Sequence, residues 1–133
     1  MTVAPGPCAR MRAMGSDAFR CALQQYHEAV MRTSIPVENA RAALLLVAGL
    51  DDHVWPSDVM AKQIEDRRTR SPVATGDVVL YLPHSGHVFP AWPGPPALDF
   101  DRFGGNREGA AKAFETAWPA MLHFLHVNLQ GGE

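Results

Sequence analysis

The sequence predicts an α/β fold built on a single βαβ unit. Two apolar segments of strand length, residues 42–48 and 77–82, flank a segment with helical spacing that starts at Ser57 and Asp58. The first apolar run is unbroken and is closed by Gly49, which is typical of a strand covered on both faces and therefore of parallel pairing. Strand, helix and strand in this order form a right-handed crossover by a strong general rule.

A helix is expected on each side of this unit. Apolar side chains recur at helical spacing in both segments: Phe19, Leu23, Tyr26 and Val30 in the first, and Ala110, Phe114, Trp118, Met121 and Leu125 in the last. Ser16 is expected to cap the first helix, which ends near Arg32, and Asn106 the last. Pro119 lacks an N–H group and should kink the last helix or split it in two.

The chain is expected to form one domain with a short leader. Residues 1–15 contain two prolines and two glycines without periodicity, which indicates a flexible leader. Residues 16–130 then form the domain. Residues 83–105 are rich in Pro and Gly, and a long loop of this kind in a small domain is usually functional or mobile.

Composition excludes several classes of partner. The chain is 47% hydrophobic and 20% charged with a net charge of −2, which favours neither nucleic acid nor an anionic membrane. No apolar run approaches the roughly 20 residues needed to span a bilayer. Arg67, Arg68 and Arg70 form a short basic group that we interpret as a solvated helix end. Cys8 and Cys21 have neither metal-type spacing nor the density of a disulfide scaffold, so we expect a cytoplasmic location.

Acidic and histidine residues follow the two predicted strands. Asp51 and Asp52 come after the first strand, and His84 and His87 come after the second. The carboxyl ends of parallel strands meet at one edge of a sheet, where catalytic groups gather. An acid followed by a histidine on the next strand is the chain order of α/β-hydrolases. There the carboxylate holds the imidazole in one tautomer, so that its other nitrogen accepts a proton from the nucleophile.

Several segments extend this pattern: IPVE (35–38), ALLLVAGLDDHVWPS (43–57), LYLPHSGH (80–87), FGG (103–105) and AWPAMLHFLHVNL (117–129). From about Tyr26 to Leu129 the chain resembles the C-terminal domain shared by acyl-CoA thioester hydrolases and bile acid-CoA:amino acid N-acyltransferases. The resemblance implies a partial α/β-hydrolase fold, namely a C-terminal βαβ unit with flanking helices. It also implies that Asp52 is the triad acid and His87 the base, with Asp51 as a less favoured substitute for the acid.

The nucleophile of such a triad is not recognisable in this sequence. In the family that it resembles, a Ser or Cys lies on a G-x-[SC]-x-G turn upstream of this region, and no such motif occurs here. Residues 6–10 match half of the pattern, which makes Cys8 a weak candidate. One donor of the oxyanion hole is missing with the nucleophile, because it is the next backbone N–H.

Each of these residues also has a structural interpretation. Paired aspartates after a strand often serve only turn chemistry. The His84/His87 and His123/His126 pairs have metal-type spacing, but zinc needs three or four ligands, so we expect no metal and place the second pair on a helix surface. Trp55 and Trp118 are interpreted as core or pocket-wall residues. Trp92 either lines a substrate channel or serves only in packing.

The sequence leaves two functions open. The first is hydrolysis of an acyl-CoA thioester, or acyl transfer, in fatty acid metabolism, without a bound cofactor and with a nucleophile from an upstream segment or another chain. The second is a catalytically inactive, truncated hydrolase that acts as a binding module. In both cases two strands leave open sheet edges, which predicts pairing with a second copy, pairing with a nucleophile-bearing partner, or marginal stability. The Arg and Ala bias is compatible with a GC-rich bacterial source.

Overall fold

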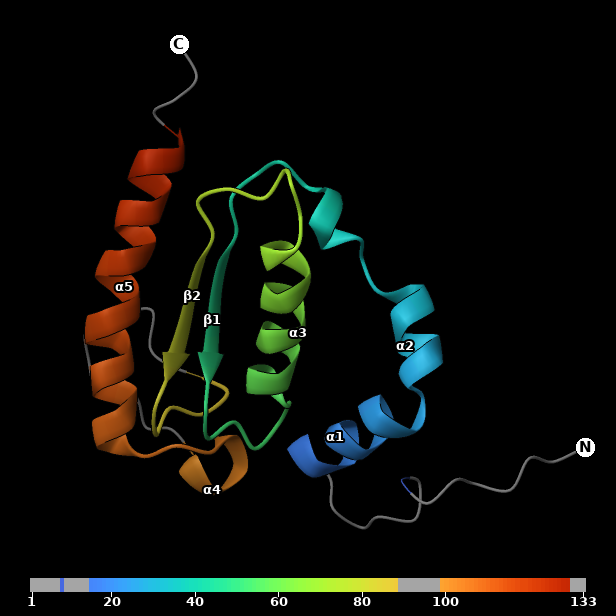
Figure 1. Ribbon diagram of the computed structural model, residues 1–133. Coiled ribbons are helices and arrows are strands. Elements are labelled where there is room, and N and C mark those ends of the chain that lie inside the picture. The colour runs from blue at the N-terminus through green and yellow to red at the C-terminus, as the bar shows by residue number, and fades with distance from the viewer. Residues whose placement is uncertain (1–7, 9–14, 89–98, 130–133) are drawn as a thin grey trace, which may run out of the picture.

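A parallel two-stranded sheet forms the centre of the computed structural model, which describes residues 8, 15–88 and 99–129 (Figure 1). Strand β1 (Leu45–Gly49) pairs with β2 (Val78–Leu82) in a register that runs from Leu45 opposite Val78 to Gly49 opposite Leu82. The predicted parallel pairing is therefore confirmed. Most of the predicted leader, as well as Trp92, lies outside the described residues.

Strand β1 begins three residues later than the apolar run predicts. The backbone of residues 42–44 is engaged by side chains rather than by a full strand ladder. The Ala42 carbonyl accepts from Arg68 at 2.9 Å, and the Leu44 N–H donates to Asp77 at 2.9 Å. Hydrophobicity alone cannot place this boundary, because the residues on either side of it are equally apolar.

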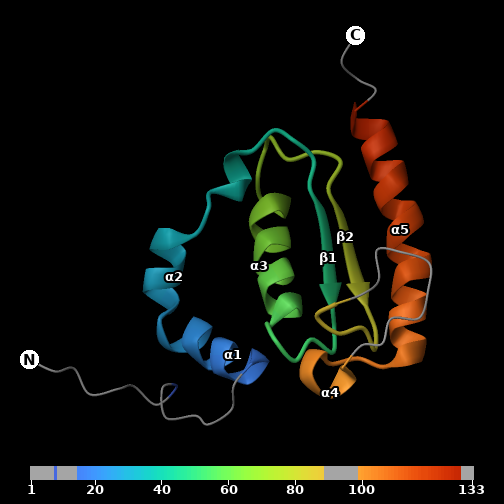
Figure 2. The ribbon, with the colours of Figure 1, turned by 180° about the vertical axis from the view of Figure 1, so that it is seen from behind.

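Two helices cover opposite faces of the sheet (Figures 1 and 2). Helix α3 (Ser57–Thr69) lies on one face, and α5 (Arg107–Leu129) lies on the other. The core consists of Leu82 packed on Ala113 and Ala117, with Val47 and Leu80 against them. Small alanines let α5 approach the strands closely, so both strands are covered as their unbroken apolar sequences predict.

Pro119 does not split α5, which is assigned as one continuous helix. Of the two expected outcomes, the split into two helices is therefore wrong. Pro119 is exposed on the outer face of the helix, so the carbonyl group that loses its partner can be hydrated while the inner face stays packed. Asn106 caps this helix as predicted, since its Oδ1 accepts from the Gly109 N–H at 2.8 Å.

The amino-terminal helical segment is divided, although its spacing predicts one helix. Helix α1 (Ser16–Gln25) is capped by Tyr26, and α2 (His27–Thr33) follows before the short 3₁₀ helix η2 (Val37–Asn39). The N-cap position is taken by Gly15 rather than Ser16. Ser16 is instead buried, and its N–H donates to the His53 carbonyl at 2.9 Å, which fixes the start of α1 against the loop after β1.

The cysteines form a disulfide between Cys8 and Cys21 of α1. Cysteine number and spacing do not predict this bond, and the bond removes the argument from cysteine usage for a reducing compartment. Their 13-residue separation carries no motif, so only the folded chain brings them together. Within the described residues, no helix combines the length and apolar character required to cross a membrane.

A buried arginine ties together the end of the sheet where both strands begin. Arg68, on α3, is only 3% exposed, and its Nε and Nη2 donate to the two Asp77 carboxylate oxygens at 2.6 and 2.7 Å. Its Nη1 also donates to the carbonyls of Val37 and Ala40. Hydrogen bonding to Arg68 holds the pKa of Asp77 below its ordinary value, in spite of burial. The interpretation of residues 67–70 as a solvated helix end is therefore wrong for Arg68.

We predict that Arg68→Met destabilises the fold, because it leaves the Asp77 carboxylate and several carbonyl groups without their donor. The matched control is Arg70→Met, at an exposed arginine two residues along the same helix end. Thermal melting followed by circular dichroism should show a fall of more than about 5 °C for Arg68→Met and a small change for the control. Equal changes in the two variants would contradict this role.

Candidate active site

The loops that follow β1 and β2 bring Asp52 and His87 into contact. Asp52 lies three residues beyond Gly49, and His87 lies five residues beyond Leu82. Their side chains meet with Nδ1 of His87 3.0 Å from Oδ2 of Asp52. The expected spatial relation between the two residues is therefore present, at the edge where both strands end. Their catalytic role stays a prediction.

The Asp52 carboxylate is buried and has four hydrogen-bond partners. Its Oδ1 accepts from the N–H groups of Val54 and Trp55 at 2.8 and 2.9 Å, and its Oδ2 accepts from the Ser57 hydroxyl as well as from His87. Burial alone would raise the pKa of Asp52, but these hydrogen bonds outweigh it and hold the pKa below its usual range. Asp52 is therefore ionised at neutral pH. Its carboxylate accepts hydrogen bonds from the backbone of its own loop and contacts His87 at the same time.

The charge of Asp52 determines which His87 nitrogen carries the proton. An ionised carboxylate can only accept hydrogen bonds, so Nδ1 of His87 is the donor in this pair. In the neutral imidazole, Nε2 is then the proton acceptor. In the part of the chain that the structure describes, no side chain is hydrogen-bonded to Nε2. The side chain of His87 is 27% exposed.

Two further contacts fix the position of His87. Its backbone N–H donates to the Phe103 carbonyl at 2.8 Å. Its ring meets the indole of Trp55 edge to face, with centroids 5.1 Å apart and an interplanar angle of 71°. Trp55 is half exposed, so its interpretation as a core residue is wrong, whereas a place in a pocket wall agrees with the structure.

Glycines allow the three loops around this pair to touch through their backbones. Gly104 forms a bridge with Asp52, and Gly105 forms one with Ser85. A Cβ atom on Gly86 would overlap the carbonyls of Phe103 and Gly104, and one on Gly104 would overlap the Asp51 carbonyl. Residues 103–105, which the sequence places in an irregular loop, thus comprise the end of the single turn of helix α4 (Phe100–Phe103) and the two glycines after it, and they contact both site loops.

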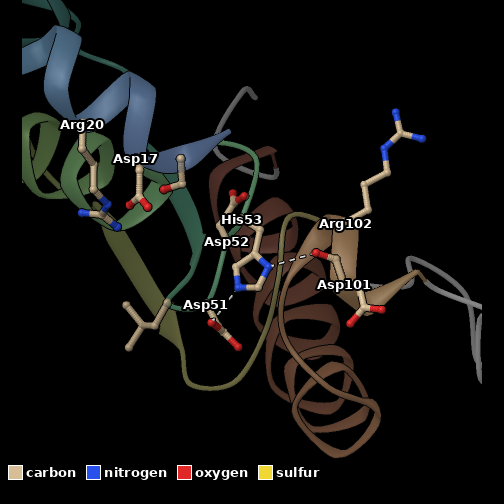
Figure 3. Close-up of a pocket in the computed structure, with 9 residues that line it drawn as sticks. Asp17, Arg20, Asp51, Asp52, His53, Asp101 and Arg102 are labelled. Atoms are coloured by element: carbon tan, nitrogen blue, oxygen red, sulfur yellow. Dashed lines mark hydrogen bonds and ion pairs between the residues drawn. The ribbon is translucent and has the colours of Figure 1, made fainter. Parts of the chain in front are cut away.

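Asp51 is directed away from His87 and cannot replace Asp52 without rearrangement. Its Oδ2 accepts from the Gly105 N–H at 3.1 Å, and its Oδ1 lies 3.4 Å from Nε2 of His53. Figure 3 shows His53 between Asp51 and the Asp101 carbonyl, which is 3.3 Å from its Nδ1. The choice of Asp52 over Asp51 as partner of the histidine is therefore supported by geometry.

A polar hollow of about 600 Å³ opens beside Asp51 and His53 (Figure 3). Nine residues line it: Ser16, Asp17, Arg20, Leu50, Asp51, Asp52, His53, Asp101 and Arg102. Four of them are aspartates and two are arginines, and Arg20 already pairs with Asp58 at 2.6 Å. Because carboxylates outnumber the cationic groups, this hollow does not favour an anionic ligand.

Sequence reasoning missed Ser57, and the structure does not support the weak candidate nucleophile Cys8. Ser57 is expected only to start α3, but its hydroxyl binds the Asp52 carboxylate instead of capping the helix. Its place five residues after Asp52, where the loop ends and α3 begins, is the signal that points to it. Cys8 is bonded to Cys21, so its sulfur is not a nucleophile in this state.

The remaining histidines form no metal site in the structure. Among residues 8, 15–88 and 99–129, no group of three or more His, Cys, Asp or Glu side chains is arranged to hold a metal ion. His84 has a left-handed backbone with φ of 56°, and its carbonyl accepts from the Asn106 N–H at 3.1 Å. His123 and His126 are exposed on α5, as expected.

Comparison with known proteins confirms the family resemblance. A family described as "BAAT / Acyl-CoA thioester hydrolase C terminal" matches residues 9–131. The chain is 30% identical over 105 residues to acyl-coenzyme A thioesterase 6 of Mus musculus, which covers 73% of this chain and 25% of that protein.

Two further relatives show the same relation. The peroxisomal succinyl-coenzyme A thioesterase of Mus musculus is 33% identical over 103 residues, covering 71% of this chain and 24% of its own length. The mitochondrial acyl-coenzyme A thioesterase 2 of Homo sapiens is 30% identical over 118 residues, covering 77% of this chain and 23% of its own length. The chain thus spans about a quarter of the length of the curated relatives that it matches.

We predict that Gly104→Ala disrupts the contact between Asp52 and His87, because its Cβ would overlap the Asp51 carbonyl. Gly76→Ala is the matched control: Gly76 also has a positive φ, but its added Cβ would lie 3.5 Å from the nearest atom, on Ala43. The control should lose only the roughly 1–2 kcal/mol of an Ala in left-handed backbone. Gly104→Ala should lose more and should also shift the NMR signal of the His87 ring. An unchanged His87 signal would contradict the prediction.

Proposed function

We propose that this chain, which belongs to the family of BAAT and acyl-CoA thioester hydrolase C-terminal domains, provides the acid and base of a Ser/Cys-His-Asp triad for acyl-CoA thioester hydrolysis. The proposal rests on the 3.0 Å contact between Asp52 and His87, with the acid buried and ionised. We further propose that the βαβ unit and its helices are the carboxyl-terminal part of an α/β-hydrolase fold.

In this reaction His87 would move the proton. Its Nε2 takes the proton from a Ser or Cys nucleophile, whose oxygen or sulfur attacks the thioester carbonyl. The carbon–sulfur bond breaks, and the imidazolium returns its proton to the departing CoA thiolate. Water then attacks the acyl-enzyme with His87 as base, and the free acid leaves. Asp52 keeps Nδ1 protonated and stabilises the imidazolium charge during both steps.

The nucleophile would come from outside these 133 residues. No G-x-[SC]-x-G motif is present in the sequence, and Cys8 is held in a disulfide. Upstream residues of a longer chain or a separate chain could place the hydroxyl or thiol against Nε2 and add the oxyanion-hole donors. If an amine replaces water as the acceptor, the same acid and base would support acyl transfer.

The second candidate function is a non-catalytic interaction module, and exposed apolar surface favours it. Leu122, Leu125, Val127 and Leu129 on the second half of α5 are between 43% and 75% exposed. The two-stranded sheet also leaves strand edges unpaired among the described residues. Both features suit a protein partner, either a second copy or a nucleophile-bearing chain.

Gel filtration with light scattering measures whether these surfaces are used. If sheet edges pair between chains, the protein should form a dimer at micromolar concentration. A Pro substitution of Leu45 on β1 should weaken it, because the backbone of Leu45 faces the open edge rather than β2 and Pro cannot donate to a strand ladder. A monomer with a high melting temperature would contradict pairing.

A cytoplasmic location also remains a proposal, and the disulfide provides its test. In a reducing compartment Cys8 and Cys21 should be free thiols rather than the disulfide of the structure. Thiol labelling immediately after cell lysis measures this state directly. Full protection of both cysteines would contradict a cytoplasmic location.

We expect thioester hydrolysis to depend on His87. The chain is mixed with, or fused behind, a nucleophile-bearing upstream half from a related acyl-CoA thioesterase, and CoA release is followed. His87→Ala should lower kcat by about three orders of magnitude or more, because the proton acceptor is lost. His84→Ala is the matched control, three residues away on the same loop, and should retain activity. Equal activity of the two variants would rule out the proposed role of His87.

A further inference from the structure

An apolar pocket of about 210 Å³ lies next to the Asp52–His87 pair. Five residues line it: Phe19 and Leu23 from α1, Trp55 and Pro56 from the loop after Asp52, and Met60 from α3. Trp55 belongs to both places, since its indole lines the pocket and also contacts the His87 ring. The pocket and the site therefore share one side chain.

The walls of this pocket are fixed from three directions. Arg20 of α1 pairs with Asp58 of α3 at 2.6 Å, and the Ser16 N–H donates to the His53 carbonyl at 2.9 Å. The disulfide joins Cys21, also on α1, to Cys8. Figures 1 and 2 both show α1 beside the first turn of α3, at the end of the molecule where the two strands finish.

The lining determines the kind of ligand that fits. The side chains on every wall are apolar. Phe19 and Trp55 are each 50% exposed and Met60 is 41% exposed, so apolar surface in the pocket remains open to solvent. Its volume is below the roughly 300–1,000 Å³ of pockets that hold drug-sized ligands. A nucleotide is excluded by size and polarity, whereas an unbranched hydrocarbon chain satisfies both constraints.

We propose that this pocket binds the acyl chain of the thioester and limits its length. The inference rests on the proposed function, because it assigns the acyl part of that substrate to a site beside the base. Trp55 then has two roles: it forms a wall of the acyl pocket, and it positions the imidazole against which the thioester carbonyl is placed. The polar CoA part of the substrate would lie outside the pocket.

Calorimetric titration of the whole chain with S-alkyl CoA thioethers tests the proposal without any turnover. These compounds cannot be hydrolysed, so binding is measured whether or not a nucleophile is present. Affinity should rise roughly fourfold per methylene and then level off once the pocket is full. Butyl and decyl thioethers that bind no better than CoA alone would overturn the proposal.

Variants that change the volume of the pocket provide the second measurement. Leu23→Trp should fill it and move the plateau to shorter chains, whereas Leu23→Ala should enlarge it and move the plateau to longer ones. Leu125→Trp, on the exposed end of α5, is the matched control and should leave the plateau unchanged. If Leu23→Trp lowers the melting temperature, Met60→Trp repeats the test from α3. A plateau that no variant moves would overturn the assignment.

The two proposals fail separately. Turnover that depends on His87 but not on the length of the acyl chain would support the proposed function and contradict the assignment of the pocket to the acyl chain. Length-dependent binding that is lost in Leu23→Trp, together with no turnover after a nucleophile is supplied, would support the acyl pocket and contradict the catalytic role of His87. A dimer that dissociates in Leu23→Trp would identify a second copy as the occupant and would overturn the acyl assignment.

Discussion

Close backbone contact between three loops is the constraint on which the site depends. The Leu50 N–H donates to the Leu82 carbonyl and the Asp51 N–H to the Ser85 carbonyl, both at 3.0 Å, so the loops after β1 and β2 continue to pair beyond the strands. Residues 103–105 then close over both loops through backbone bridges. Side chains at Gly86 or Gly104 would separate these segments, and with them Asp52 and His87.

The two ends of the small sheet are stabilised by different means. Where the strands begin, Arg68 pairs with Asp77 and also donates to backbone carbonyls of the segment before β1. These hydrogen bonds take the place of strand partners that the small sheet lacks. Where the strands end, glycines and backbone hydrogen bonds hold the loops. The polar network stands far from the acid and base, which therefore have an environment of their own. A two-stranded sheet needs such reinforcement, because its buried apolar surface is small.

The chemistry of the acid and base follows from this environment. Four donors keep the Asp52 carboxylate ionised, and the ionised carboxylate in turn fixes the tautomer of His87. Trp55 lies against the imidazole and also lines the apolar pocket, so a single side chain connects proton transfer with acyl binding in our proposals. The relatives named as thioesterases are about three times as long as this chain, and in our proposal the complete reaction would use groups beyond these residues.

The sequence by itself determined the βαβ unit, the parallel pairing and the two loops whose side chains meet at the strand ends. Those features depend on local periodicity and on chain order, which the linear sequence contains. The tertiary structure alone decided the partners of Arg68, the role of Ser57, the Cys8–Cys21 disulfide and the place of residues 103–105. Each of these contacts depends on where a side chain or a loop points once the helices have packed. It also decided between Asp51 and Asp52: neighbouring carboxylates have the same chemistry in the sequence, and only the direction of each side chain in the folded loop distinguishes them.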